Sequence, residues 1–327
     1  MRYVGIDMSK ATFYASSDSG HPHVFENSMH GWNKFERWIT ASGHHHNDTT
    51  IGTEATGAYH IPFATSLVRS GWDVKVINPV IVKRYAKTKL RGVKTDKADS
   101  ETVRSVVALG EGYLFDSKPE MLALKGLVRE RKNLVSLGAV LKQRLHAANW
   151  NDREGGEAAA SLRRLQTAVN KEIHRVEERI VPYTAGTGKL LETIPGIGSA
   201  CAAALVASVG DIHRFPSPKK LAAFVGLDCT VFESGESIHH SSHITKRGDR
   251  GLRHLLFMAA LSAIRGIPEL RTFYDRRIND GHHHFSALCA AERKLIHIIW
   301  AVWTRGTPFE KRIAQKDTTI LSTVTTA

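Results

Sequence analysis

Residues 2–25 decide how the N-terminal part of the chain folds, and they read RYVGIDMSKATFYASSDSGHPHVF. They contain a short apolar run, Tyr3 to Ile6, and an extended pattern from Thr12 to Ser16. Asp18-Ser19-Gly20 has the composition of a turn, after which His23 to Phe25 can pair back as a third strand. The stretch therefore predicts a meander of three strands.

Helical and extended patterns alternate along the chain after this meander. Helices are expected at residues 32–39, 61–70 and 97–109, and strands at 49–55 and 74–77. A three-strand meander followed by alternating helices and strands is the order of a ribonuclease-H-like domain, so we predict an α/β fold for this region.

The middle of the chain has helical character throughout. Residues 121–145 contain neither proline nor strand-like alternation, and a break at 151–156 follows them. Apolar residues then recur at steps of three and four, at Leu162, Leu165, Val169, Ile173, Val176 and Ile180. This a/d seam predicts a long helical hairpin or coiled coil. An ordinary amphipathic helix buried within one subunit fits the pattern equally well, and only the coiled coil implies self-association.

A glycine turn introduces the C-terminal region. Gly196 and Gly198, in Ile194-Pro195-Gly196-Ile197-Gly198, precede an alanine-rich stretch and predict a helix, a tight turn and a second helix. In proteins that handle DNA such a hairpin presents backbone N–H groups to a phosphate, although the same residues also occur in plain turns. The remaining chain, to about Gly306, is expected to be helical and to end in a polar tail.

Length and charge limit the classes of protein. A chain of 327 residues is too long for one small core and suggests two domains with a linking element. The net charge of +13 favours a polyanion as partner, because each Lys or Arg near a phosphate releases condensed counterions. The three cysteines, at positions 201, 229 and 289, lie far apart among apolar residues and are expected to be buried thiols in a reducing cytoplasm. The sequence contains neither a signal peptide nor a stretch that could span a bilayer, so no membrane partner is expected.

Four acidic residues have the pattern of a metal site. Asp7 and Glu54 end two apolar, strand-like runs, where an unpaired charge is costly. Asp96 and Asp99 are three residues apart, which places both on one face of a helix, although Thr95 or Asp96 could also be a simple N-cap. Carboxylate oxygens are the ligands of hard cations, so we expect one or two Mg²⁺ ions at this site.

Two basic clusters are candidates for contact with a nucleic-acid backbone. The first precedes the helical acids and comprises Lys83, Arg84, Tyr85, Lys87, Lys89, Arg91 and Lys94, with the tyrosine able to stack on a base or ribose. The second comprises Lys246, Arg247, Arg250 and Arg253.

The sequence resembles a known family along nearly its whole length. The N-terminal motifs that carry the resemblance are Gly5-Ile6-Asp7-Met8-Ser9-Lys10, Glu54-Ala55-Thr56-Gly57-Ala58-Tyr59, Ile77-Asn78-Pro79 and Lys94-Thr95-Asp96-Lys97-Ala98-Asp99. The C-terminal motifs are Ile194-Pro195-Gly196-Ile197-Gly198, Phe224-Val225-Gly226-Leu227, Phe232-Glu233-Ser234-Gly235 and Ile244-Thr245-Lys246-Arg247-Gly248 with Leu252-Arg253. These motifs resemble those of the DEDD transposases, the recombinases of insertion sequences that encode a bridge RNA, which are related to invertases of pilin genes.

The resemblance implies a domain organisation and a chemistry. It implies a RuvC-like domain over residues 1–113, a helical coiled-coil linker over 114–188 and a mainly α transposase domain over 189–327. It assigns the metal-binding tetrad to Asp7, Glu54, Asp96 and Asp99, and the catalytic nucleophile to Ser234. From the residues alone, Ser237, Ser241 and Ser242 compete with Ser234 for that role.

The resemblance also implies partners and a location. It implies donor and target DNA, a guiding bridge RNA and a homo-tetramer built as a dimer of dimers, in the cytoplasm of a prokaryote at its nucleoid. We therefore expect a Mg²⁺-dependent, RNA-guided DNA recombinase that forms a phosphoserine link to DNA. The alternatives are a protein-only DNA invertase, a junction-resolving nuclease that uses water instead of a serine, and a catalytically inactive nucleic-acid-binding protein.

Overall fold

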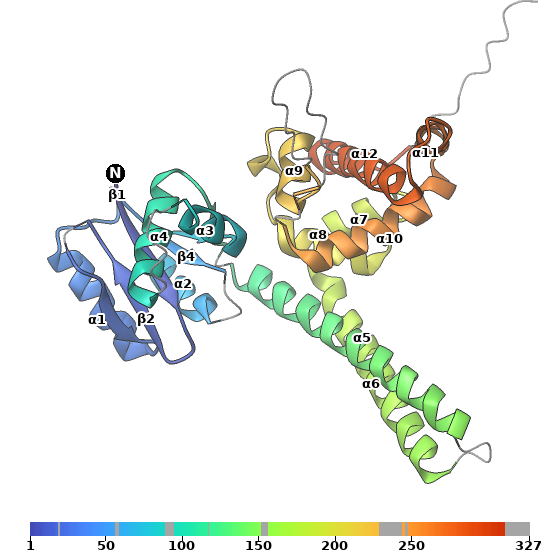
Figure 1. Ribbon diagram of the computed structural model, residues 1–327, viewed down its shortest axis with the longest axis horizontal. Coiled ribbons are helices and arrows are strands. Elements are labelled where there is room, and N and C mark those ends of the chain that lie inside the picture. The colour runs from blue at the N-terminus through green and yellow to red at the C-terminus, as the bar shows by residue number, and fades with distance from the viewer. Residues whose placement is uncertain are drawn as a thin grey trace, which may run out of the picture.

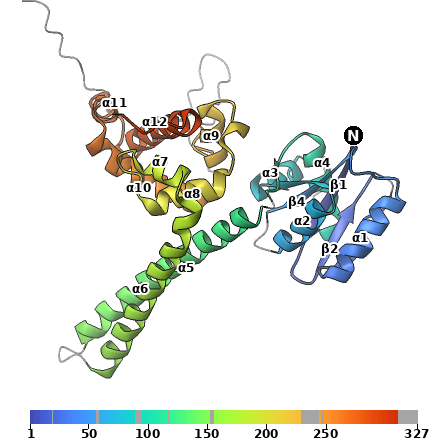
Figure 2. The ribbon, with the colours of Figure 1, turned by 180° about the vertical axis from the view of Figure 1, so that it is seen from behind.

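The chain forms two globular regions and a long helical hairpin between them in sequence. The computed structural model describes residues 1–18, 20–55, 59–88, 95–116, 118–151, 156–228, 244–245 and 248–310. The hairpin projects away from both globular regions (Figures 1 and 2). The predicted mixture of strands and helices at the N-terminal end and the mainly helical C-terminal end are both confirmed. Within the ranges just given, no helix combines the length and the apolar character that a bilayer crossing requires.

In the part of the chain that the structure describes, six strands form one mixed sheet in the order β3-β2-β1-β4-β5-β6. Their bounds are Arg2–Met8 (β1), Thr12–Ser16 (β2), His23–Glu26 (β3), Thr49–Glu54 (β4), Asp73–Ile77 (β5) and Tyr113–Leu114 (β6). β2 runs antiparallel to both β1 and β3, which confirms the meander, whereas β1, β4 and β5 are parallel to one another. β6 pairs antiparallel with β5 and extends the sheet past residue 113. This sheet is compatible with a ribonuclease-H-like domain.

Helices cover both faces of the sheet. They are α1 (Met29–Ala41), α2 (His60–Arg69), α3 (Pro79–Ala86) and α4 (Asp96–Ala108). Val4 and Ile6 of β1 pack with α1 and α2, through Phe35 and Phe63 among others. Because side chains alternate along a strand, Gly5 and Asp7 lie on the opposite face, where α4 packs.

Two long helices build the hairpin, α5 (Pro119–Asn151) and α6 (Glu157–Thr184). The 33 residues of α5 make a rod of about 50 Å. Arg131 of α5 and Glu177 of α6 form an ion pair with an Nη2–Oε1 distance of 2.7 Å. Of the expected seam, Val176 and Ile180 are buried, whereas the side chain of Leu165 nearer the tip is 51% exposed. The buried part of the seam, Val176 and Ile180, therefore shares a core with Leu124 of α5 in the same chain.

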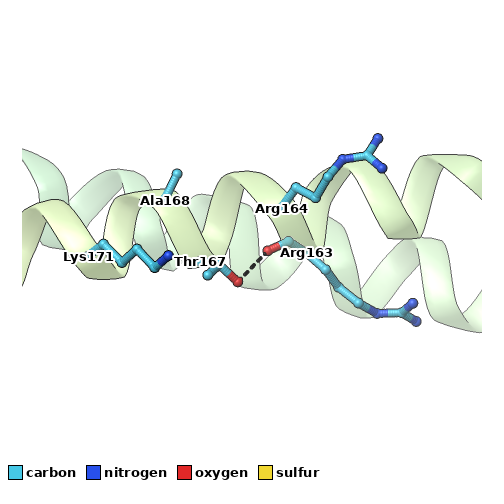
Figure 3. Close-up of a pocket in the computed structure, with 5 residues that line it drawn as sticks. All are labelled: Arg163, Arg164, Thr167, Ala168 and Lys171. Carbon is cyan, nitrogen blue, oxygen red and sulfur yellow. Dashed lines mark hydrogen bonds between the residues drawn. The ribbon is translucent and has the colours of Figure 1, made fainter.

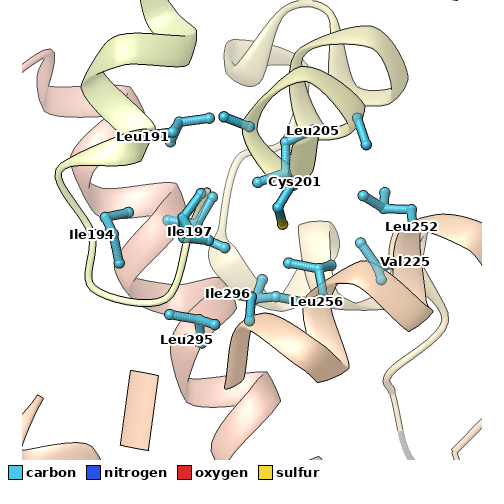
Figure 4. Close-up of a cluster of buried hydrophobic side chains, with 14 of the residues drawn as sticks. Leu191, Ile194, Ile197, Cys201, Leu205, Val225, Leu252, Leu256, Leu295 and Ile296 are labelled. Atoms are coloured by element: carbon cyan, nitrogen blue, oxygen red, sulfur yellow. The ribbon is translucent and has the colours of Figure 1, made fainter. Parts of the chain in front are cut away.

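The C-terminal region is a compact group of helices around one apolar core. Its helices are α7 (Thr187–Glu192), α8 (Ser199–Val209), the 3₁₀ turn η1 (Ile212–Arg214), α9 (Pro218–Val225), α10 (Arg250–Gly266), α11 (Pro268–Asn279) and α12 (His284–Arg305). Figure 4 shows Cys201 among leucine, isoleucine and valine side chains of this core, which agrees with the expected buried thiol. Cys289 is only partly buried, and Cys229 lies outside the described residues. Leu124 of α5 and Ile180 of α6 join the same core, so the base of the hairpin is anchored in this region.

Candidate active site

Asp7 and Glu54 stand next to each other on neighbouring parallel strands. Ile6 of β1 is in register with Thr53 of β4, so the next residue of each strand is an acid. Gly52, two residues before Glu54, contacts α4, which places Glu54 on the same face of the sheet as Asp7. Both acids therefore lie at the C-terminal ends of their strands and on the face that α4 covers.

Glycines in the sheet allow α4 to approach this face closely. A Cβ atom built on Gly5 would lie 2.2 Å from both the backbone nitrogen of Arg104 and the carbonyl oxygen of Ser100. A Cβ atom on Gly52 would lie 3.0 Å from Cβ of Val107. Strand β1 thus touches the backbone of α4 directly, and any larger side chain at Gly5 would force the helix away.

The N-terminus of α4 brings the second pair of acids to the site. Thr95 is the N-cap, because its hydroxyl accepts a hydrogen bond from the backbone N–H of Ala98 at 3.2 Å. Of the two residues considered for this role, Thr95 therefore caps the helix and leaves the Asp96 carboxylate available. Asp96 and Asp99 both lie in the first turn of α4, with Asp99 partly buried and Asp96 exposed.

The four acids interact electrostatically. Burial, followed by the charges of Asp99 and Asp96, raises the pKa of the Asp7 carboxyl to about 6. Burial also raises the pKa of Glu54, and the charge of Asp7 adds to this effect. Lys83 of α3 acts in the opposite direction on Glu54, so one member of the first basic cluster reaches the field of the site.

The chemistry of this donor set fits a divalent cation. Four hard carboxylate oxygen donors repel one another, and a bound cation would offset that repulsion. Among the described residues, however, no three His, Cys, Asp or Glu side chains converge closely enough to form a ready metal-binding group. The acids lie close enough to interact electrostatically, but they do not form a complete coordination shell for a metal ion.

The first basic cluster is carried in part by helix α3. Asn78 caps this helix through a hydrogen bond from the backbone N–H of Val80, and Pro79 occupies its first position. The cluster residues within α3 or just after it are Lys83, Arg84, Tyr85 and Lys87, of which only Tyr85 packs partly into the core. Lys89, Arg91 and Lys94 lie outside the described residues. No helix was predicted here, although a proline directly after an N-cap residue is a typical helix start.

The glycine turn between α7 and α8 packs against α10. Gly196 has φ +94°, and a Cβ atom built on it would lie 2.4 Å from the carbonyl oxygen of Ala259. Both the backbone conformation and the packing therefore require glycine at position 196. At Gly198, the residue before α8, no described atom beyond its chain neighbours lies within 4 Å of a built Cβ atom. Contact between this turn and a phosphate stays a prediction, and Gly198 is the residue that leaves room for it.

The expected nucleophile Ser234 lies outside the described residues, as do Lys246 and Arg247. Arg250 is the first residue of α10 and is exposed. Arg253, one turn later, is only partly exposed, and its Nη1 donates hydrogen bonds to the carbonyl oxygens of Val225 and Gly248. The four carboxylates and these basic residues thus belong to different regions of the chain.

Comparison with known proteins reveals the family. Residues 4–148, which include all four acids, match a family described as "Transposase", the DEDD transposases of IS110 type. Residues 188–275, which include Gly196 and Arg253, match the "Transposase IS116/IS110/IS902 family". The pilin gene-inverting protein of Moraxella bovis is 31% identical over 95% of this chain and 98% of its own length.

The chain belongs to the IS110 family of DEDD transposases. The transposase for insertion sequence element IS1328 of Yersinia enterocolitica is 24% identical over 94% of this chain and 98% of its own. A protein of insertion element IS110 from Streptomyces coelicolor is 34% identical over 47% of this chain and 38% of its own. As an IS110-family member, the protein is a DNA transposase or recombinase, an enzyme whose substrate is DNA.

Two features of this IS110-family transposase were not predicted from its sequence. One is a basic groove of about 360 Å³ along a single face of α6, lined by Arg163, Arg164, Thr167, Ala168 and Lys171 (Figure 3). Its residues recur at helical spacing, which is the signal that could have found it. The other is Glu292 of α12, whose side chain is buried in the helical core and only 2% exposed. A single acid within an apolar helix has no spacing signature, so sequence alone could not have identified Glu292.

Proposed function

We propose that this transposase is a Mg²⁺-dependent, RNA-guided DNA recombinase that cuts and rejoins strands through a serine nucleophile. The observation that carries the proposal is the placement of Asp7 beside Glu54, on the sheet face that receives the N-terminus of α4 with Asp96 and Asp99. The raised pKa values of Asp7 and Glu54 support a site that a cation completes.

In this proposal the chain has three functional parts. Residues 1–113 are a RuvC-like catalytic domain, 114–188 a coiled-coil linker, and 189–327 a transposase domain with a helix-hairpin-helix-like turn. The strand order of the sheet and the pairing of α5 with α6 support the first two assignments. The tight packing of Gly196 on α10 supports a rigid turn in the third.

The proposed chemistry divides the work between the acids and the serine. Asp7, Glu54, Asp96 and Asp99 would hold one or two Mg²⁺ ions, which supply positive charge to the phosphate in the transition state. The Ser234 oxygen attacks the phosphorus and loses its proton, while the bond from phosphorus to a sugar oxygen breaks and that oxygen gains a proton. The DNA strand is then linked to the serine until a sugar hydroxyl attacks the phosphorus and loses its proton, the bond from phosphorus to the serine oxygen breaks, and Ser234 regains a proton.

Nucleic acid would be held by residues from both globular regions, most of them basic, together with one tyrosine and two glycines. On the N-terminal side these are Lys83, Arg84, Tyr85, Lys87, Lys89, Arg91 and Lys94, and on the C-terminal side Gly196, Gly198, Lys246, Arg247 and Arg250. Arg253, which the sequence placed with them, hydrogen-bonds instead to the backbone of Val225 and Gly248. The exposure of Lys83, Arg84, Lys87 and Arg250 is consistent with phosphate contact. The basic groove on α6 adds further positive surface.

We further propose that the active form is a homo-tetramer, a dimer of dimers, that works with a bridge RNA on donor and target DNA. It would act in the cytoplasm of a prokaryote, at the nucleoid. Membership of the IS110 family and the net charge of +13 support these partners. Exposed apolar residues on the hairpin, Val135, Leu137, Val140 and Leu165, are consistent with self-association.

The test of the nucleophile compares two serine variants. Ser234→Ala should abolish strand cleavage and the covalent protein–DNA adduct seen on a denaturing gel, while DNA binding is retained. Ser237→Ala is the matched control and should form the adduct at the normal rate. Cleavage without any adduct, in the wild type or in Ser234→Ala, would favour the junction-resolving nuclease that uses water.

A second candidate function is a protein-only DNA invertase. Its support is the pilin gene-inverting protein of Moraxella bovis, which is similar over nearly the full length of both chains. The two candidates share the metal and serine chemistry and differ in the need for RNA. Purification from the host with nucleic acid retained, followed by sequencing of the bound RNA, separates them. A single RNA from the flank of the gene supports the guided recombinase, whereas heterogeneous RNA or none supports the invertase.

A further inference from the structure

Residues 228 and 245 enclose the part of the sequence that contains Ser234, and the structure ties them together. The backbone N–H of Thr245 donates a hydrogen bond to the carbonyl oxygen of Asp228 at 2.9 Å. The Thr245 hydroxyl also donates to the Asp228 carboxylate. Two residues that are 17 positions apart are thus held side by side.

The same two stretches of chain meet a second time, where Gly248 contacts the end of α9. A Cβ atom built on Gly248 would lie 2.3 Å from the carbonyl oxygens of Phe224 and Val225. Gly248 leads into α10 and Val225 ends α9, so the backbones on either side of residues 229–243 touch directly. Only glycine permits this approach.

The guanidinium group of Arg253 hydrogen-bonds to both of these stretches of chain. Its Nη1 donates to the carbonyl oxygen of Val225 at 3.2 Å and to that of Gly248 at 2.5 Å. Hydrogen bonds from a charged donor are stronger than those between neutral groups. The guanidinium therefore bridges the end of α9 and the start of α10. We call this pair of hydrogen bonds the Arg253 bridge.

Arg253 also interacts electrostatically with a buried acid. Glu292 of α12 is 2% exposed, and the charge of Arg253 opposes the rise that burial causes in the pKa of the Glu292 carboxyl. Arg253 is only partly exposed, whereas Arg250, one turn earlier on α10, is exposed. The two arginines thus have different surroundings, although both belong to the second basic cluster of the sequence.

We propose that Arg253 is a positioning residue for strand cleavage: its guanidinium holds Val225 and Gly248 together and thereby fixes the two points between which the Ser234 segment is attached. Arg253 acts on the backbone of its own chain and does not contact DNA or RNA. The role in cleavage rests on the proposed function of Ser234, whereas the Arg253 bridge does not.

The test uses Arg253→Gln, Arg253→Lys and Arg250→Gln in the full-length protein. The reporter is hydrogen exchange of the Thr245 amide, with the Leu205 amide in the α8 core as reference. In Arg253→Gln we expect the Thr245 amide to exchange at least about tenfold faster, since the local opening that exposes this amide becomes easier, while Leu205 is unchanged. Arg253→Lys should lie between this variant and the wild type, and Arg250→Gln should exchange as the wild type does.

DNA binding and cleavage give the complementary readouts. Arg253→Gln should bind DNA within about twofold of the wild type with the same salt dependence, yet form the covalent adduct at least about tenfold more slowly. Arg250→Gln should weaken binding and reduce the slope of log affinity against log salt by about one. The proposal is overturned if Arg253→Gln behaves like Arg250→Gln and the Thr245 amide keeps its protection, because Arg253 would then be a phosphate contact.

An error in the proposed function is distinguishable from an error in the assignment of the Arg253 bridge. If Ser234→Ala still forms the adduct, the nucleophile assignment is wrong, but the exchange of the Thr245 amide still decides whether Arg253 joins Val225 to Gly248. If Arg253→Gln raises exchange at Leu205 as strongly as at Thr245, the residue stabilises the whole helical core and the positioning role is refuted. Arg253→Lys, which keeps the positive charge, provides the same comparison should Arg253→Gln fail to fold.

Discussion

Gly5 of β1 and Arg104 of α4 are in direct backbone contact: a Cβ atom added to Gly5 would lie 2.2 Å from the Arg104 nitrogen. This contact holds the first turn of α4, with Asp96 and Asp99, above the strand that carries Asp7. The geometry of the candidate site therefore depends on a position that has no functional group at all.

Gly5→Ala should destabilise the fold, because the added methyl group meets backbone atoms on a helix and not the flexible end of a side chain. We expect a loss of about 2–3 kcal/mol or more in the free energy of unfolding, measured by denaturant titration. Gly126→Ala in α5 is the matched control, since no described atom lies near its Cβ position, and it should gain up to about 1 kcal/mol. Equal effects at the two positions would contradict the close approach of α4.

Asp7→Asn should have opposite effects on stability and on activity. Removing one of the mutually repelling charges should raise the melting temperature of the metal-free protein by a few degrees. The same change removes a proposed metal ligand, so strand cleavage should fall at least about 100-fold, and added Mg²⁺ should no longer raise the melting temperature.

Asp73→Asn is the control for Asp7→Asn, because Asp73 is an exposed acid. It is the first residue of β5 and lies at the end of that strand away from the four acids. Its response to Mg²⁺ should equal that of the wild type. A stabilisation by Mg²⁺ that survives in Asp7→Asn would place the metal elsewhere.

The buried Glu292 should make the free energy of unfolding fall as the pH rises from about 5 to about 8. Burial raises its pKa from 4.5 to about 8, so the folded state holds a proton that the unfolded state has already released between these values. The stabilisation is complete below the unfolded pKa and is lost as the pH rises through about 8. Melting temperatures measured from about pH 5 to about pH 9 should therefore decline.

Glu292→Gln should flatten this decline, because the amide does not titrate. The nearby Cys201 thiol does not mask the effect, since burial raises its pKa to about 12. A wild-type decline that persists unchanged in Glu292→Gln would assign the pH dependence to another group.

Arg214 should couple the sheet to the helical region. Its guanidinium carbon lies 5.2 Å from the ring centre of Tyr113 in β6 and 4.9 Å from that of Phe224 in α9. Cation–π contacts of this kind contribute about 0.5–2 kcal/mol each, so Arg214→Gln should lower the free energy of unfolding by about 1–3 kcal/mol. Arg265→Gln, at an exposed position of α10, should change it by less than about 0.5 kcal/mol. A loss of equal size at both positions would refute a specific contact.

Periodicity predicted those elements whose patterns are local. The meander of β1, β2 and β3 and the helix that begins at Asp96 follow from alternation, turn residues and an N-cap threonine. Helix α3 was not predicted, because the basic residues after Pro79 were considered only as a candidate contact to nucleic acid. The seam of α6 was visible, but only the structure revealed that its buried part packs against α5 of the same chain.

Sequence by itself determined the types of residue available for chemistry: four acids at strand ends and a helix start, basic clusters, and motifs of the IS110 family. Only the tertiary structure decided which of them meet. The register of Ile6 with Thr53 places Asp7 beside Glu54, and the glycines beneath α4 bring Asp99 to them. It also gave Arg253 partners in its own backbone, which no pattern of charges could indicate. The physical reason is that spacing along a chain encodes local periodicity, whereas charge–charge and backbone contacts between distant segments exist only after the chain has packed.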